Sequence, residues 1–155
     1  MREIKSVVLH CTATPLDRKL TVKEIRKWHV KGNGWSDIGY HFVIHQDGTI
    51  ERGRHIGKVG AHTWGNNHGS IGVAYCGGVE KKVLKSMDKE KPKSKTTLVS
   101  KDTMTDEQEA SFRNLFKMLE IMFGELKLRG HNDYTSSKDC PGFKVREKFG
   151  DIMEL

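Results

Sequence analysis

The stretch TDEQEASFRNLFKMLEIMF, residues 105–123, carries the strongest structural signal in the sequence. It opens with Thr105 and, three residues later, Gln108, the capping-box pair that satisfies free N–H groups where a helix begins. Apolar side chains then recur at helical spacing and share one face: Phe112, Leu115, Phe116, Leu119, Met122 and Phe123. Gly124 follows the last of them, as is common at a helix end. The pattern predicts an amphipathic helix that packs on a sheet.

Short apolar segments on both sides of this helix predict the strands of that sheet. The segments are residues 4–11, 40–44, 49–52, 70–76 and 127–130. Asp47-Gly48 lies between the second and third of them and is a hairpin signature. A second capping box, from Thr21 to Glu24, predicts another helix. Strands that alternate with helices indicate an α/β fold with a central mixed sheet flanked by helices.

Length and composition limit the class of protein. The chain has 155 residues, which is the size of one domain, so we expect a single domain over residues 1–155. It contains 27 Lys and Arg against 20 Asp and Glu, a formal net charge of +7. No apolar stretch approaches the roughly 18 residues that a membrane-spanning helix needs. A transmembrane protein is therefore excluded.

Most of the positive charge lies in one segment, residues 79–101. It holds eight lysines against three acidic residues, a surplus of five in a net charge of +7. With Pro92 and little apolar content, it predicts a long, partly mobile surface loop tipped by a hairpin. Aromatic residues are not interleaved with these lysines, which disfavours nucleic-acid binding by base stacking.

A histidine and a cysteine late in the chain suggest a metal site. His131 and Cys140 bracket a loop, with Lys138 before the cysteine, and His10 closes the first predicted strand. Imidazole and thiolate are ligands that suit Zn²⁺. On spacing alone, a surface histidine and a buried free cysteine remain the simpler interpretation.

Four segments taken together favour the metal site. In chain order they are residues 8–14 (VLHCTAT), 39–44 (GYHFVI), 67–73 (NHGSIGV) and 129–141, which ends in Lys-Asp-Cys-Pro. This set resembles the zinc-dependent N-acetylmuramoyl-L-alanine amidases of the T7 lysozyme type, which are related to peptidoglycan recognition proteins. The resemblance extends from about residue 7 to 143 and leaves out the lysine-rich segment. It implies an α/β fold with a zinc cleft on one face of the central sheet.

The resemblance also implies roles for individual residues. The zinc ligands of the family match His10, His131 and Cys140, and its catalytic tyrosine and lysine match Tyr40 and Lys138. Three protein ligands leave one tetrahedral position open, which is typical of one catalytic Zn²⁺.

Two further residues lie in the glycine-rich loop before the fourth predicted strand. The resemblance places His62 and Asn67 along the substrate cleft, and a purely structural role in the loop is an equal alternative.

The activity implied is hydrolysis of the amide between N-acetylmuramic acid and L-alanine in bacterial peptidoglycan. One alternative is a non-catalytic module that binds muropeptides, which the presence of Tyr40, Lys138 and Cys140 disfavours. Another is a regulator that binds RNA polymerase or nucleic acid, as T7-type relatives bind their polymerase, but no residue pattern here indicates it. We expect a monomer that binds peptidoglycan and, through the lysines of residues 79–101, anionic wall polymers.

Residues 1–9 lack the long apolar core and cleavage site of a secretory signal. We therefore expect a protein made in the cytoplasm. A phage or prophage endolysin, which reaches the wall after a membrane lesion, fits this expectation. A cytoplasmic amidase of muropeptide recycling is the alternative.

Overall fold

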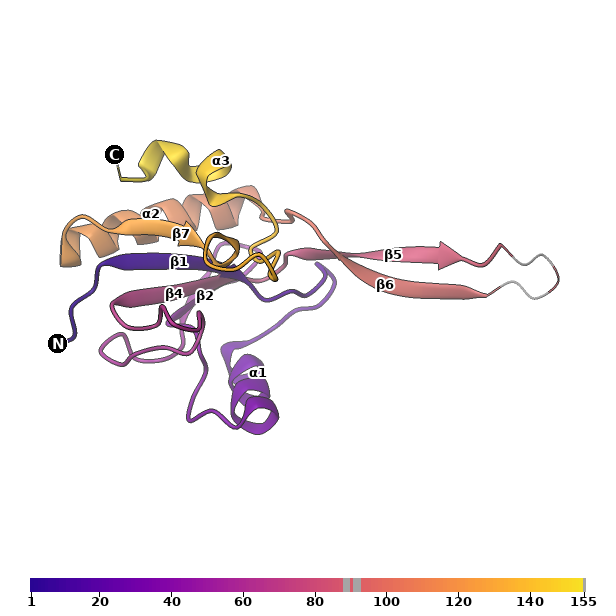
Figure 1. Ribbon diagram of the computed structural model, residues 1–155, viewed down its shortest axis with the longest axis horizontal. Coiled ribbons are helices and arrows are strands. Elements are labelled where there is room, and N and C mark those ends of the chain that lie inside the picture. Colours follow the sequence, from indigo (N-terminus) through magenta and orange to yellow (C-terminus); the bar gives the residue numbers. More distant parts are fainter. Residues whose placement is uncertain (88–89, 91–92, 155) are drawn as a thin grey trace.

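The computed structural model describes residues 1–87, 90 and 93–154, and its centre is a five-stranded sheet in the order β3-β2-β4-β1-β7 (Figure 1). Its strands are β1 (Ser6–Cys11), β2 (Phe42–Ile44), β3 (Ile50–Arg52), β4 (Ser70–Tyr75) and β7 (Lys127–Gly130). β1 pairs in parallel with β4 and β7, whereas β3 is antiparallel to β2. The predicted mixed α/β sheet is therefore confirmed.

The long helix predicted from residues 105–123 is α2 (Asp106–Phe123). The Thr105 hydroxyl accepts from the Gln108 backbone N–H, and the Gln108 side chain accepts from the Thr105 N–H, as the capping box requires. Phe112 and Phe116 are buried against the sheet, but Met122 is 60% exposed, so its place on the buried face was wrong. The next residue, Phe123, is partly buried and packs against the core.

Helices cover both faces of the sheet, as Figure 1 shows with α2 and α1 on opposite sides. In β2 (Phe42–Ile44), Ile44 belongs to the same core cluster as Phe112 of α2. Its neighbour Val43 packs on the other face with Ile25 of α1 (Val22–Lys27). Side chains alternate along a strand. In β1, Val7 and Leu9 therefore face α2, and His10 faces the opposite side. The remaining helical elements are η1 (Trp28–Gly32), η2 (His131–Asp133), α3 (Val145–Phe149) and η3 (Gly150–Ile152).

The strand predicted over residues 40–44 begins later, at Phe42. Tyr40 and His41 still bond to neighbouring strands through their backbones, since the Tyr40 carbonyl accepts from Arg54 and the His41 N–H donates to Gly72. These bonds lie outside the regular ladder. They hold Tyr40 at the end of the sheet rather than within it.

The described part of the lysine-rich segment forms a two-stranded antiparallel ribbon, which agrees with the predicted hairpin but replaces most of the predicted loop by strands. β5 (Val79–Lys85) pairs with β6 (Ser94–Ser100) over their whole length, and the ribbon projects away from the main sheet (Figure 1). Valines and threonines among the lysines favour the extended conformation. Lys89, Lys91 and Pro92 lie outside the described residues, and mobility of the segment stays a prediction. In the described part of the chain, none of the helices is long and apolar enough to cross a membrane.

Candidate metal centre

His10 and His131 come together because their strands are parallel neighbours. In the β1–β7 register, Leu9 lies opposite Gly130, so the next residues along the two strands are His10 and His131. Their ring centroids are 4.7 Å apart. Adjacent parallel strands end at the same edge of a sheet, and that edge is where α/β proteins commonly place their sites.

The loop after His131 folds back and brings Cys140 to the same edge. The Asn132 N–H donates to the Cys140 carbonyl at 2.8 Å, and the Cys11 N–H donates to Cys140 Sγ at 3.1 Å. The Asp133 carboxylate, which accepts from the Gly130 N–H at 2.7 Å, holds the first turn of this loop. The thiol is thereby fixed against the end of β1.

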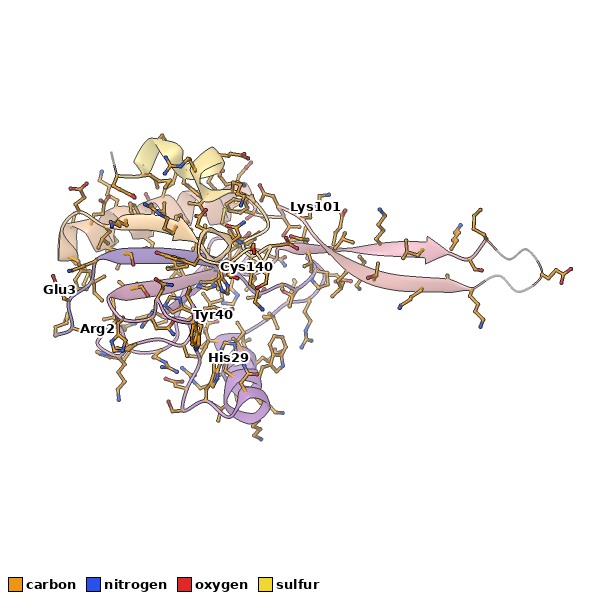
Figure 2. The ribbon with its side chains drawn as sticks, viewed as in Figure 1. Arg2, Glu3, His29, Tyr40, Lys101 and Cys140 are labelled. Carbon is orange, nitrogen blue, oxygen red and sulfur yellow. The ribbon has the colours of Figure 1, made fainter. Side chains whose placement is uncertain are left out.

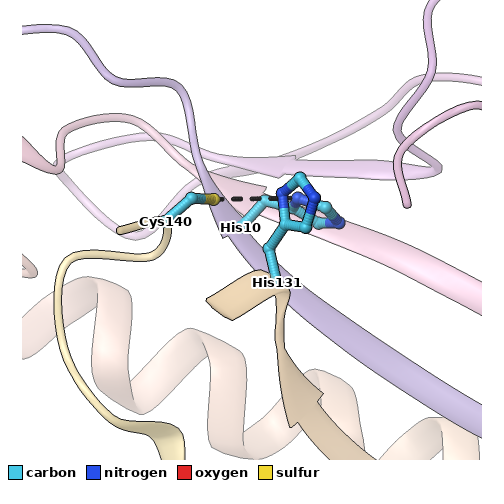
Figure 3. A group of neighbouring side chains, drawn as sticks. All are labelled: His10, His131 and Cys140. Carbon is cyan, nitrogen blue, oxygen red and sulfur yellow. Dashed lines mark hydrogen bonds between the residues drawn. The ribbon is translucent and has the colours of Figure 1, made fainter. Parts of the chain in front are cut away.

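His10, His131 and Cys140 form a group whose ligand atoms all lie within 4.8 Å of one another (Figure 3). His10 Nδ1 faces Cys140 Sγ at 3.7 Å. Tetrahedral Zn–S and Zn–N bonds of ordinary length separate a sulfur from a nitrogen by about 3.6 Å. The spacing of these two atoms therefore matches two ligands of one zinc ion.

The environment keeps the imidazoles neutral, which is the form that binds a metal. Burial, with the neighbouring His62 and His131 acting in the same direction, holds the pKa of His10 well below its usual range. Burial and then Lys138 lower the pKa of His131. The adjacent Cys11 thiol and burial raise the pKa of Cys140, so its thiolate needs a nearby cation such as a metal ion.

His62 lies directly behind His10. Its Nδ1 is 2.9 Å from His10 Nε2 and 3.0 Å from Thr63 Oγ1, and its Nε2 is 3.2 Å from Ser70 Oγ. Burial lowers the pKa of His62 to about 3, so this ring is neutral as well. Sequence reasoning placed His62 near the substrate and missed its contact with His10. It also missed Thr63 and Ser70, because hydroxyl residues in a loop and on a strand carry no signal of their own.

Tyr40, labelled in Figure 2, lies beside the group. Its ring centroid is 5.3 Å from that of His10. Burial, together with the Cys140 charge, raises the pKa of the Tyr40 hydroxyl. The hydroxyl therefore stays protonated and can donate a hydrogen bond.

Lys138 is exposed on the loop between His131 and Cys140. Its positive charge acts to lower the pKa of both His131 and Cys140.

Asn67 shapes the loop that carries His62. Its Oδ1 accepts from the backbone N–H groups of His62 and Thr63, each at 2.9 Å. Contact of His62 and Asn67 with substrate stays a prediction.

Comparison with known proteins identifies the family. Residues 1–143 match the family described as N-acetylmuramoyl-L-alanine amidase. The chain is 38% identical over 142 residues to the endolysin of Enterobacteria phage T3, covering 92% of this chain and 83% of that one. It is also 38% identical to the endolysin of Escherichia phage T7, over 91% of this chain and 82% of that one.

Comparison with solved structures is consistent with this family. The amidase LysC from Clostridium intestinale superposes with a TM-score of 0.72 at 28% identity, over 96% of this chain and 87% of that one. Bumblebee PGRP-SA shares the fold, with a TM-score of 0.74 at 24% identity, over 99% of this chain and 84% of that one. The chain therefore belongs to the N-acetylmuramoyl-L-alanine amidase family.

Proposed function

We propose that this amidase hydrolyses the bond between N-acetylmuramic acid and L-alanine in peptidoglycan with one zinc ion held by His10, His131 and Cys140. The observation that carries the proposal is the convergence of the three ligand atoms within 4.8 Å at the end of β1. Two imidazoles and a thiolate suit Zn²⁺ and leave one tetrahedral position open. A zinc ion bound there would lower the pKa of a water ligand toward about 7 and polarise the scissile carbonyl.

Tyr40 and Lys138 supply the remaining catalytic groups in this proposal. The protonated Tyr40 hydroxyl, beside His10, orients the attacking water or passes a proton to the leaving amine. The Lys138 ammonium stabilises negative charge that develops on the carbonyl oxygen. Its exposed position lets it meet a substrate that arrives from solvent.

A non-catalytic muropeptide-binding module is the competing function. Such a module has no need for an open metal position flanked by a tyrosine hydroxyl and a lysine. The relatives that cover most of the chain carry the name endolysin. We therefore favour wall lysis after release of the protein to the wall.

Metal analysis and lysis assays test the zinc proposal. We expect one zinc per chain, and loss of peptidoglycan cleavage after chelation that zinc restores. Cys140→Ser should lose zinc, since a hydroxyl is a far poorer ligand than a thiolate. Cys76→Ser is the matched control, because Cys76 is buried on the α1 side of the sheet, in a cluster with Ile25 and Val43. Full cleavage by metal-free protein would overturn the zinc site.

The lysines of the β5–β6 ribbon suggest a second partner surface, which we assign to anionic wall polymers. In the ribbon register, Lys82 and Lys95 lie on one face and Lys81 and Lys85 on the other. All four are exposed. A projecting ribbon with positive charge on both faces can contact a flexible anionic chain from either side.

A further inference from the structure

We infer that His62 is a positioning residue: with Ser70, it fixes the tautomer of His10 that carries hydrogen on Nε2 and leaves Nδ1 free for the metal. The inference rests on the proposed zinc site and adds to it a reason for the orientation of the first ligand. It follows from the direction of a chain of hydrogen bonds that begins at two backbone carbonyls.

The first link fixes the Ser70 hydroxyl. Ser70 Oγ lies 2.7 Å from the Asn66 carbonyl oxygen and 3.1 Å from that of Asn67. A carbonyl oxygen only accepts, so the hydroxyl hydrogen of Ser70 points toward this pair. The Ser70 oxygen then has only lone pairs to offer to His62 Nε2, at 3.2 Å. His62 must therefore carry its hydrogen on Nε2.

The second link carries this direction to His10. A neutral imidazole with hydrogen on Nε2 has a lone pair on Nδ1. His62 Nδ1 is 2.9 Å from His10 Nε2, so His10 Nε2 must be the donor of that bond. Thr63 Oγ1 supports the same arrangement, since it lies 3.2 Å from His10 Nε2 and 3.0 Å from His62 Nδ1. The hydroxyl oxygen of Thr63 can accept a share of the bond from His10 Nε2–H, while the single lone pair of His62 Nδ1 accepts the rest.

The last link concerns His10 Nδ1, the nitrogen that faces the proposed metal position. With hydrogen on Nε2, the lone pair of His10 is on Nδ1, the atom that faces Cys140 Sγ at 3.7 Å. A metal-bound histidine commonly donates its other N–H to a fixed acceptor, which sets both tautomer and ring orientation. His62 is that acceptor here.

The protein is built to keep the His62 ring in this place. The ring lies over Gly72 of β4, where an added Cβ would come within 2.5 Å of His62 Cγ. His62 is 8% exposed, Thr63 2% and Ser70 0%, so water does not compete for these bonds. The burial of the ring and the engagement of both its nitrogens favour positioning over direct substrate contact.

Nitrogen NMR of metal-free wild-type protein tests the tautomer directly. We expect His10 Nε2 to give a pyrrole-type signal, bonded to hydrogen, and Nδ1 a pyridine-type signal. The same spectrum should show hydrogen on Nε2 of His62. A His10 ring with its hydrogen on Nδ1 would overturn the inference.

Zinc affinity, measured by competition with a chelator, tests the role. We expect His62→Phe to weaken zinc binding about 10–100-fold, in line with the loss of other outer-sphere partners. Ser70→Ala should show a smaller loss and a mixture of His10 tautomers, and it covers the case in which His62→Phe does not fold. His45→Gln is the control, because His45 is a half-buried histidine that bonds to Glu51 and not to His10.

The outcomes separate this inference from the zinc proposal. If wild-type protein binds zinc and folded Ser70→Ala or His62→Phe binds it equally well, His62 has no positioning role. If wild-type protein binds no zinc, the metal site itself is wrong, and the inference fails with it.

Discussion

Lys138 is exposed, whereas His10 is buried and the other two proposed metal ligands, His131 and Cys140, are partly buried. A cation in this position does not hold the metal, so its effect should appear only when negative charge develops on the substrate. This separates the expected phenotype of Lys138 from that of Cys140, whose loss removes a ligand.

We expect Lys138→Ala to lower kcat about 10²–10³-fold, the usual effect of removing one oxyanion-stabilising group. Zinc content and KM should change little. Steady-state cleavage of a soluble muropeptide measures kcat and KM, and metal analysis of the same sample measures the zinc content. Lys117→Ala, on the exposed side of α2, is the control, and near-wild-type turnover of Lys138→Ala would remove Lys138 from the catalytic groups.

Of the strands in the described residues, only β5 and β6, which form the ribbon, lie outside the central sheet. One lysine of the ribbon is partly neutralised, since Lys81 pairs with Asp17 at 2.6 Å, and Lys101, just after β6, pairs with Glu80 of β5 at 2.8 Å. Exposed pairs of this kind are weak. The ribbon therefore keeps a positive surface, as the proposed contact with anionic wall polymers requires.

Neutralising the ribbon should weaken attachment to the wall without changing catalysis. The variant replaces four exposed lysines by glutamine: Lys82, Lys85, Lys93 and Lys95. It should sediment less with intact sacculi at low salt, and the difference should shrink as salt rises, because exposed charges more than about 10 Å apart are screened at 0.1 M. Cleavage of a soluble muropeptide should be unchanged.

A matched variant carries the same number of exchanges on the main domain: Lys23, Lys31, Lys117 and Lys144. Its sedimentation should fall less than that of the ribbon variant. If the ribbon variant instead loses activity on the soluble muropeptide with its zinc and fold intact, the ribbon belongs to the active site.

For the molecule as a whole, protonation of His41 is expected to make the free energy of unfolding depend on pH. The Gly72 N–H donates to its Nδ1 at 3.0 Å, and its Nε2 donates to the Lys58 carbonyl at 2.8 Å. Protonation of Nδ1 would break the first bond. Burial lowers the pKa of His41 from 6.5 to about 4, and the charges of Arg2 and Arg54 act in the same direction.

Between pH 6.5 and about 4 the unfolded chain therefore binds a proton at His41 that the native state does not. Native stability should fall as pH falls through this window, and the contribution of His41 is at most about 3 kcal/mol. Urea unfolding of metal-free protein across this range measures it. In His41→Phe the free energy of unfolding should fall less steeply as the pH is lowered, and in a variant of the exposed His55 it should fall as in the wild type. A wild-type slope in His41→Phe would contradict the prediction.

Local pattern was enough to predict most elements of this fold. The capping box at Thr105, the apolar stripe of α2 and the glycine at its end are all short-range features, and each describes a hydrogen bond or a contact within a few residues. The strands were predictable for the same reason. The residue types of the metal group were also evident from the sequence, although their convergence depended on the resemblance to a known family.

Only the tertiary structure decided how distant residues meet. His10 contacts Cys140, 130 residues away in the sequence, and His62, 52 residues away. These contacts form because strand order, and not periodicity, sets which loops share an edge of the sheet. Composition likewise described the lysines of residues 79–101 but not the pairing of β5 with β6. A propensity acts within a segment, whereas these contacts require partners that only the folded backbone brings within hydrogen-bonding distance.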